Sequence, residues 1–347
     1  MKKKRIGLMG CGVVADYGHL PAIKAVEDFE LVALFDVNKQ NVQDKARKFA
    51  VKHACTDVAE FFGTGLDAVA ITSPVPAHLD NIRQAAQRGI HVLCEKPLGM
   101  NDGEVAEEIR LMHAAGKMLV TGFCYRFSPV ALKIKELIEQ GAIGAVRSLR
   151  LIYIWNCHGK YLAGPGKTLS PRWHGRMIEG GPMVDCGAHQ IDLARWWVGE
   201  VVRSHGEGAW INAEYSAPDH MWLHLDHASG AHTMVEISYS YGHTVKDPIW
   251  QFSYEIIGTK GLIRYDRERE VFEVRGERET QVLAWDHEKN FEGMYRAFAQ
   301  ALNSGQMGPL PTGEDGLQVT KLAREATEQL ERAKPASVSG AAAAREV

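Results

Sequence analysis

The chain has 347 residues, a formal net charge of −3, 45% hydrophobic residues and 24% charged residues. This length suggests two domains of ordinary size, and the composition is that of a soluble globular protein. The small negative charge gives no electrostatic basis for binding nucleic acid or an anionic membrane. The basic start, residues 1–5, precedes an apolar run too short for a signal peptide, and no segment approaches the length of a transmembrane helix. We therefore expect neither a nucleic-acid partner nor a membrane partner.

The cysteines and histidines suggest neither disulfides nor a metal site. None of the cysteines at 11, 55, 94, 124, 157 and 186 forms a CxxC pair, so we expect buried thiols in a reducing compartment, the cytoplasm. The histidines at 220, 224, 227 and 232 cluster, but their spacing is not that of a zinc site. We interpret them as part of a solvated or interface strand and predict no bound metal.

Short apolar runs alternate with helical patterns over residues 1–125. Strands are predicted at 6–9, 31–35, 68–72, 90–93 and 118–121, and helices at 13–27, 38–50, 77–88 and 101–115. This alternation is typical of βαβ units that build a doubly wound parallel sheet. The sequence therefore predicts an α/β Rossmann domain over residues 1–125.

The pattern changes after about residue 145. Alternating runs at 146–154, 202–211, 219–227, 231–241, 251–257 and 270–275 predict a large, mainly antiparallel open sheet. Helices are predicted at 182–198, 290–303 and 314–333. We expect residues 126–334 to form an α+β domain for substrate binding and oligomerisation, and residues 335–347 to form a disordered tail. Val235, Ile237, Tyr239 and Tyr241 share a strand face, which we expect a second copy to cover in a homodimer or homotetramer.

A glycine-rich turn follows the first predicted strand. Gly10 permits a sharp turn, Gly12 lets a pyrophosphate approach the backbone, and the N–H groups at Gly12, Val13 and Val14 begin the helix. Asp36 ends the second strand, where a carboxylate binds the ribose 2′-hydroxyl and repels a 2′-phosphate. No arginine follows it, so we predict NAD rather than NADP, although the nearby Lys39 leaves NADP open.

Three further segments follow predicted strands and so belong to the same sheet edge. Thr72, Ser73 and His78 lie in a loop that would pass over the cofactor, although His78 equally suits a helix-capping role. Glu95 and Lys96 precede a proline, and a fixed ammonium there would stabilise a developing alkoxide. Tyr125 and Arg126 end the last strand as cleft residues or as a hinge without ligand contact.

Asp185, His189 and Asp192 are spaced i, i+4 and i+7, which places them on one face of an α-helix. Most of the rest of that helix is apolar, so the polar strip is expected to face a cleft. An exposed Asp–His pair is the alternative. Polar and aromatic residues are dense between 153 and 176, which suits carbohydrate recognition or an oligomer interface. The candidate substrate residues there are Trp155, Arg172, Trp173 and His174, with Tyr125 from the first domain.

Taken in this order, the motifs resemble the glucose–fructose oxidoreductase / inositol dehydrogenase / rhizopine-catabolism (Gfo/Idh/MocA) family. The resemblance implies hydride transfer between NAD and a secondary hydroxyl or ketone of a sugar, cyclitol or related polyol. It implies that Lys96 reaches the nicotinamide and the substrate hydroxyl and that Glu95 belongs to the same cofactor-binding motif. It also implies that Lys96, Asp185 and His189 are catalytic, with the last two on the substrate side. We expect His189 to act as the general base.

Three other functions fit the same motifs. They are an NADP-dependent sugar reductase, a glycosidase that retains NAD, and a non-catalytic NAD-binding regulator, against which the intact Lys96, Asp185 and His189 argue. The sequence names neither the substrate nor the direction of the reaction in the cell.

Overall fold

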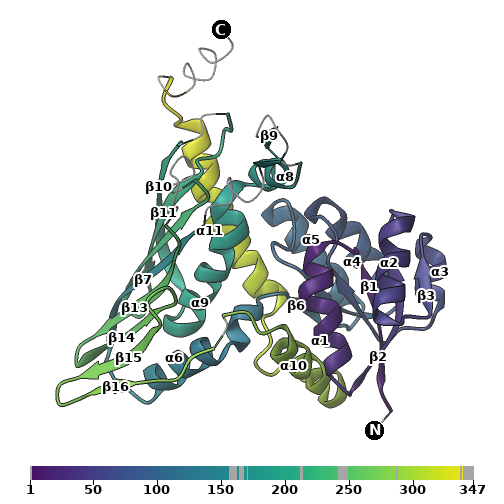
Figure 1. Cartoon of the computed structure of the whole chain (residues 1–347), viewed down its shortest axis with the longest axis horizontal. Helices are drawn as coiled ribbons and strands as arrows, with labels where there is room; N and C mark the ends of the chain where they lie inside the picture. Colours follow the sequence, from purple (N-terminus) through teal and green to yellow (C-terminus); the bar gives the residue numbers. More distant parts are fainter. Residues whose placement is uncertain are drawn as a thin grey trace. The chain divides into compact units, whose positions relative to one another are not determined.

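The computed structural model describes residues 2–155, 162–163, 168–169, 171–211, 214–240, 249–286, 288–336 and 338 (Figure 1). For residues 162–163, 168–169 and 171–173 it describes the backbone only. The chain forms two compact units: unit 1 is Met1–Ser128 with Lys289–Thr320, and unit 2 is Pro129–Glu288 with Lys321–Val347. The expectation of one continuous second domain over 126–334 is corrected, because the segment 289–320 returns to unit 1.

A six-stranded parallel sheet forms the centre of unit 1, in the order β3-β2-β1-β4-β5-β6. This confirms the predicted Rossmann fold. The sequence did not reveal β3, because its three residues make no apolar run. The strands are β1 (Lys4–Met9), β2 (Phe29–Phe35), β3 (His53–Cys55), β4 (Ala68–Ile71), β5 (His91–Cys94) and β6 (Leu119–Thr121).

Helices lie on both faces of this sheet (Figure 1). Helices α3, α4 and α5 share one apolar cluster with the sheet, in which Phe61, Ile82 and Met112 are buried. Helix α1 contacts both α2 and α10. The helical elements are η1 (Ala15–His19), α1 (Leu20–Ala25), α2 (Lys39–Phe49), α3 (Val58–Gly63), η2 (Val75–Ala77), α4 (His78–Gln87), α5 (Asp102–Ala114), η3 (Cys124–Phe127) and α10 (Phe291–Ser304).

An eight-stranded sheet dominates unit 2, in the order β10-β11-β12-β7-β13-β14-β15-β16. Its pairs are antiparallel except β12 with β7, which confirms the predicted mainly antiparallel sheet. The strands are β7 (Val146–Ile154), β10 (Val201–Ala209), β11 (His220–His227), β12 (His232–Ser238), β13 (Gln251–Gly258), β14 (Gly261–Asp266), β15 (Val271–Gly276) and β16 (Thr280–Val282). Leu162–Ala163 (β8) and Thr168–Leu169 (β9) pair separately.

The helices of unit 2 are α6 (Pro129–Glu139), α8 (Pro171–Ile178), η4 (Met183–Gly187) and α9 (Ala188–Val198). A further helix, α11 (Gly313–Arg332), begins in unit 1 and ends in unit 2. Helix α9 contacts β7, β12 and α6, so it covers one face of the large sheet. Pro129–Glu139 and Pro171–Ile178 were not predicted as helices.

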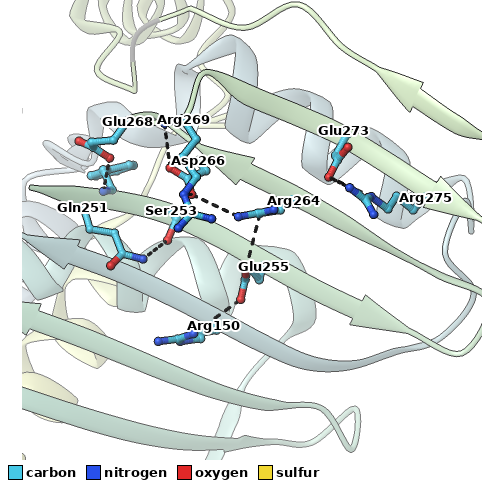
Figure 2. Close-up of polar contacts among 11 residues, drawn as sticks. Arg150, Gln251, Ser253, Glu255, Arg264, Asp266, Glu268, Arg269, Glu273 and Arg275 are labelled. Atoms are coloured by element: carbon cyan, nitrogen blue, oxygen red, sulfur yellow. Dashed lines mark hydrogen bonds and ion pairs between the residues drawn. The ribbon is translucent and has the colours of Figure 1, made fainter.

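The two faces of the large sheet differ in chemistry. Val235, Ile237 and Tyr239 are fully buried on the face that the helices cover. The expectation that these residues form an uncovered face is therefore wrong, because alternation shows which residues share a face but not which face the helices cover. Tyr241, predicted with them, lies outside the described residues. The opposite face carries Arg150, Glu255, Arg264 and their charged neighbours (Figure 2).

The tail expected from residue 335 lies outside the described residues except for 335, 336 and 338. Within the described residues, no helix combines the length and the apolar character that crossing a bilayer requires.

Candidate active site

The glycine turn after β1 leaves a backbone surface open. Gly10 has φ +98, and a Cβ there would lie 2.4 Å from the backbone nitrogen of Ser73. A Cβ on Gly12, by contrast, would meet no atom of the described residues within 4 Å. Val13 is 53% exposed and Val14 is half-buried at the start of the helix. The protein's own packing does not require a glycine at 12, so the open surface fits a pyrophosphate approaching the helix N-terminus.

The helix after this turn contains a π turn, η1. The N–H of Leu20 donates to the carbonyl of Ala15, five residues back, rather than to the residue four back. Pro21 follows and has no N–H to offer to the carbonyl of Tyr17, so the wider turn also accommodates the proline. His19, the last residue of this turn, is fully buried.

Asp36 is held beside the glycine turn. Its Oδ2 accepts a hydrogen bond of 2.7 Å from the N–H of Cys11, and its Oδ1 accepts one of 2.8 Å from the N–H of Asn38. The side chain is half-buried at the end of β2. Two backbone donors thus orient the carboxylate at the place where the sequence predicts ribose recognition.

Hydrogen bonds stabilise the loop after β4. Thr72 Oγ1 donates to the carbonyl of Gly10 at 2.6 Å, and Ser73 Oγ accepts from Asn81 at 3.0 Å. His78 is buried, with Nε2 2.9 Å from the carbonyl of Ser73 and Nδ1 2.8 Å from that of Leu98. Burial lowers the pKa of His78. The ring therefore joins two loops of the sheet edge.

The Glu95–Lys96 turn follows β5. Glu95 is buried, Lys96 is half-buried, and the Lys96–Pro97 peptide bond is cis. Glu95 Oε1 lies 2.8 Å from His19 Nε2, and Glu95 Oε2 accepts from the N–H of Lys96 at 3.2 Å. Burial by itself raises the pKa of Glu95, but the hydrogen bond and charge of His19 and the charges of Lys96 and Lys289 outweigh it and hold the pKa below its usual value.

Tyr125 and Arg126 lie in the short turn η3 after β6, and both are buried. Arg126 Nη2 lies 3.2 Å from Asp315 Oδ2. Lys289 Nζ donates to the hydroxyl of Tyr17, which is 52% exposed, at 3.2 Å. The sequence did not predict this contact between Tyr17 and Lys289. Tyr17 lies in the helix after the glycine turn, but nothing in the sequence links Lys289 to that helix.

The parallel strands therefore bring the predicted cofactor residues to one edge of the sheet of unit 1. Gly10 follows β1, Asp36 follows β2, Thr72 follows β4 and Glu95 follows β5. The strand order changes direction between β1 and β4, and ligands of such sheets bind at this switch point.

In unit 2, the Asp185 carboxylate lies among polar and aromatic side chains. Its Oδ2 accepts short hydrogen bonds from Arg176 and from the hydroxyl of Tyr239. Arg176 also lies over the Trp155 ring, 5.4 Å from its centroid, and Trp155 stacks on Tyr153 at 6.0 Å. Arg176 and Tyr239 were not predicted as site residues, because only the fold brings their segments to Asp185.

The helix of Asp185 and His189 is not a uniform α-helix. Asp185 lies in the π turn η4, whereas His189 lies in the first turn of α9. The expected α-helical i, i+4 relation is therefore altered, because a π turn takes more residues per turn. His189 is 6% exposed and Asp192 is fully buried. A Cβ on Gly187 would lie 2.5 Å from the sulfur of Met183, so the chain's own packing explains that glycine.

The other predicted substrate residues of unit 2 differ in their exposure and in how far the structure describes them. Trp155 is half-buried beside Arg176, and His174 is exposed with Nδ1 3.0 Å from the Tyr215 hydroxyl. The side chains of Arg172 and Trp173 lie outside the described residues. The histidine cluster divides between two faces: His224 and His232 approach at 3.2 Å on one, whereas His227 bonds to Gly199 and Thr233 on the other.

Known proteins resemble the chain along most of its length. Residues 4–123 match the oxidoreductase family with an NAD-binding Rossmann fold, and residues 131–264 match the GFO/IDH/MocA C-terminal domain. The chain is 28% identical to a myo-inositol 2-dehydrogenase of Thermotoga maritima over 344 residues, which cover 94% of this chain and 96% of that protein. It is 28% identical to a scyllo-inositol 2-dehydrogenase (NAD(+)) of Bacillus subtilis over 267 residues, which cover 75% and 72%.

Solved structures agree with this fold. A probable dehydrogenase from Thermotoga maritima superposes with a TM-score of 0.77 at 27% identity, over 95% of this chain and 98% of that one. A levoglucosan dehydrogenase in complex with NADH and levoglucosan gives a TM-score of 0.82 at 22% identity, over 96% and 98%, which bears on the fold alone.

Proposed function

Because the chain belongs to the GFO/IDH/MocA family of oxidoreductases, we propose how its residues divide the work of hydride transfer. The protein is an NAD-dependent oxidoreductase of sugars, cyclitols or related polyols. The observation that carries the proposal is the gathering of Gly10, Asp36, Thr72 and Glu95–Lys96 at one edge of the parallel sheet. When bound, NAD supplies the hydride acceptor, and the residues of this chain supply the rest.

The cofactor half of the site is proposed for unit 1. The N–H groups of Gly12, Val13 and Val14 would bind the pyrophosphate, which suits the open surface over Gly12. Asp36, oriented by Cys11 and Asn38, would accept hydrogen bonds from the ribose hydroxyls. Thr72, Ser73 and His78 would shape the path of the cofactor, with His78 acting through the loops that it joins. Glu95, Lys96 and Arg126 complete the proposed set.

The substrate half is proposed for unit 2. His189 would take the proton of the substrate hydroxyl, because an imidazole titrates near working pH. Lys96 would offset negative charge that develops on the substrate oxygen. Asp185, restrained by Arg176 and Tyr239, would accept a hydrogen bond from a neighbouring substrate hydroxyl or from the imidazole. Trp155 offers an aromatic face, and Arg172, Trp173, His174 and Tyr125 are the further proposed substrate residues.

We also propose a homodimer or homotetramer that uses the open face of the large sheet. On that face Arg150 lies 3.8 Å from Glu255, and Arg264 lies 3.7 Å from Glu255 and 3.4 Å from Asp266 (Figure 2). Opposite charges alternate across adjacent strands, so a second copy related by a two-fold axis can meet complementary charges. Ile257, 51% exposed, adds apolar area to the same face.

A cytoplasmic location is part of the proposal. Cys11, Cys55, Cys94, Cys124 and Cys186 are buried and form no disulfide, which suits a reducing compartment.

The experiment that tests the function is a substrate screen with both cofactors. Purified protein would be incubated with NAD⁺ or NADP⁺ and myo-inositol, scyllo-inositol, levoglucosan, D-apiose or a D-glucoside, while the absorbance of reduced nicotinamide is followed. We expect reduction of NAD⁺ by at least one polyol. Release of a sugar from a glycoside without net reduction of NAD⁺ would contradict the proposal and favour the NAD-retaining glycosidase.

A further inference from the structure

Three polar side chains connect the Glu95–Lys96 turn to helix α10. His19 ends η1, Glu95 follows β5 and Tyr295 lies in α10. His19 Nδ1 lies 2.7 Å from the Tyr295 hydroxyl, and His19 Nε2 lies 2.8 Å from Glu95 Oε1. His19 and Tyr295 are fully buried, and Glu95 is 8% exposed. Neither His19 nor Tyr295 belongs to the motifs on which the proposed function is based.

Glu95, the final acceptor, determines where the protons lie in the hydrogen-bonded series Tyr295–His19–Glu95. With its lowered pKa, Glu95 is ionised and can only accept, so His19 Nε2 carries a hydrogen in either charge state of the ring. Burial, together with the charge of Glu95, raises the pKa of Tyr295, so the phenol keeps its proton. That proton is donated to Nδ1 when the ring is neutral. His19 is thus oriented at both nitrogens.

Close packing keeps these groups in place. A Cβ on Gly18 would lie 2.8 Å from the ring of Phe291, which itself lies 4.9 Å from the His19 ring. At the other end, a Cβ on Gly122 would lie 3.1 Å from Glu95 Oε1. Glycine at 18 and 122 therefore allows α10 and β6 to close around the His19–Glu95 pair.

Glu95 transmits this restraint to Lys96. Its second oxygen, Oε2, accepts the backbone N–H of Lys96 at 3.2 Å, and the charge of Lys96 is one of the causes of the lowered pKa of Glu95. Electrostatic coupling is reciprocal, so an ionised Glu95 favours the protonated ammonium of Lys96.

We propose that Tyr295 and His19 form a hydrogen-bonded relay that keeps Glu95 ionised and thereby positions Lys96 and keeps it protonated. His19 and Tyr295 are positioning residues for hydride transfer, since they act through Glu95 and Lys96. The relay deepens the proposed function and rests on it only for the role of Lys96 in turnover. Its effect on the charge of Lys96 can be measured without any substrate.

The first test measures the reactivity of Lys96 directly. Only the neutral amine is acetylated, so competitive acetylation over a pH series, read by mass spectrometry, reports how strongly Lys96 holds its proton. His19→Met removes the donor to Glu95, and Glu95→Gln removes the charge. We expect both to lower the pH of half-labelling of Lys96 by about one unit or more. His19→Gln, whose amide can donate to Glu95, is expected to restore much of the shift.

The matched control is Phe298→Leu, which removes a fully buried ring from α10, the helix of Tyr295, and leaves Tyr295, His19 and Glu95 unchanged. It is expected to leave the labelling of Lys96 unchanged. If His19→Met labels like the wild type, or if Phe298→Leu shifts the labelling as far as His19→Met does, the relay is wrong and the cluster only stabilises unit 1.

The second test is a double-mutant cycle on turnover. With the substrate that the screen identifies, His19→Met is expected to lower kcat by about 10-fold or more, because small misplacements of a catalytic group are costly. In a Lys96→Ala background the same change is expected to cost little. Additive losses would overturn the relay. If His19→Met does not fold, Tyr295→Phe replaces it in the same cycle and tests the relay in its place. The expected loss of kcat is then smaller.

The two proposals fail in different ways. If Lys96→Ala retains full turnover, the proposed role of Lys96 is wrong, whereas the labelling experiment still decides the relay. If Lys96→Ala is inactive but His19→Met neither shifts the labelling nor couples to Lys96, the relay alone is wrong.

Discussion

The backbone N–H of Cys11 donates a hydrogen bond of 2.7 Å to the carboxylate of Asp36. The glycine turn and the proposed ribose-binding acid are therefore one structural unit, although 25 residues separate them in the chain. Asp36 both stabilises the turn that would bind the pyrophosphate and presents a negative charge beside it.

This relationship predicts the cofactor selectivity. NAD⁺ is expected to bind more tightly than NADP⁺, because the carboxylate repels a 2′-phosphate. Val37 is 87% exposed next to Asp36, so Val37→Arg adds a cation without disturbing the Cys11–Asp36 bond. We expect this variant to gain affinity for NADP⁺ by about 10-fold, roughly the value of one charge-assisted hydrogen bond. Dissociation constants of NAD⁺ and NADP⁺ from fluorescence quenching would check the wild-type preference and the effect of Val37→Arg, with Val37→Ala as the control. Tighter NADP⁺ binding in the wild type would contradict the prediction.

Removal of either proposed catalytic cation or base should impair turnover more than cofactor binding. We expect His189→Ala to lower kcat by about 10²–10⁴-fold and Lys96→Ala by about 10²–10³-fold, the usual effects of losing a general base and a charge-stabilising donor. Steady-state kinetics over a pH series and NAD⁺ titrations would separate the two effects. If His189→Ala keeps most of its turnover at every pH, His189 is not the base.

The contact between Tyr239 and Asp185 predicts an effect on substrate recognition. Tyr239→Phe removes the hydroxyl that donates to Asp185 and keeps the buried ring. Without this donor the Asp185 carboxylate loses one of the hydrogen bonds that orient it, so we expect kcat/KM to fall by about 10-fold with NAD⁺ affinity unchanged. Tyr265→Phe, which removes the hydroxyl of another buried tyrosine that bonds to Glu288, serves as the control. Equal losses in the two variants would argue against a specific role for Tyr239.

The charged face of the large sheet predicts self-association. Light scattering is expected to give a mass that is a multiple of the 38.5 kDa chain. Ile257→Asp adds a negative charge beside Glu255 on this face. Because both copies of a two-fold interface carry the change, it should shift the protein toward the monomer. Leu132→Asp, on α6, is a control of similar exposure, at 47% against 51%. A stable wild-type monomer at micromolar concentration would refute the proposed assembly.

Glu108 predicts a pH dependence of stability. It is fully buried in α5, and neither of its carboxyl oxygens has a hydrogen-bond partner among the described residues. Burial, with a smaller contribution from Glu104, raises its pKa from 4.5 to about 9. Between these values the folded state holds a proton that the unfolded chain has released. Stability therefore falls as pH rises through this range, by up to about 1.4 kcal/mol per unit, and levels off above pH 9.

The variant Glu108→Gln cannot ionise, so the fall in unfolding free energy between neutral and alkaline pH should become smaller. Denaturant unfolding of wild type and variant at several pH values would measure it. Glu107→Gln, at a half-buried position of the same helix that bonds to Arg110, is the control and should change this pH dependence little. An identical pH dependence in wild type and Glu108→Gln would show that Glu108 is already ionised in the folded protein.

Several features could be predicted from the sequence because they depend on local spacing. Short apolar runs that alternate with helical patterns determine the parallel sheet, since a buried strand needs apolar residues on both faces. Gly10, Asp36, Thr72 and Lys96 could be assigned to one sheet edge, because parallel strands all end on the same side. The alternation of Val235, Ile237 and Tyr239 likewise showed that they share a face.

Only the tertiary structure decided which face that was, and it buried Tyr239 against Asp185 rather than leaving it for a second copy. It also returned residues 289–320 to unit 1, where Tyr295 meets His19, and it turned Asp185 and His189 through a π turn that an α-helical spacing does not reveal. The physical reason is common to these cases. Periodicity records how a segment divides its own residues between two environments, whereas the partner that fills each environment comes from chain segments far away in sequence and is selected by packing and hydrogen bonding in the folded protein.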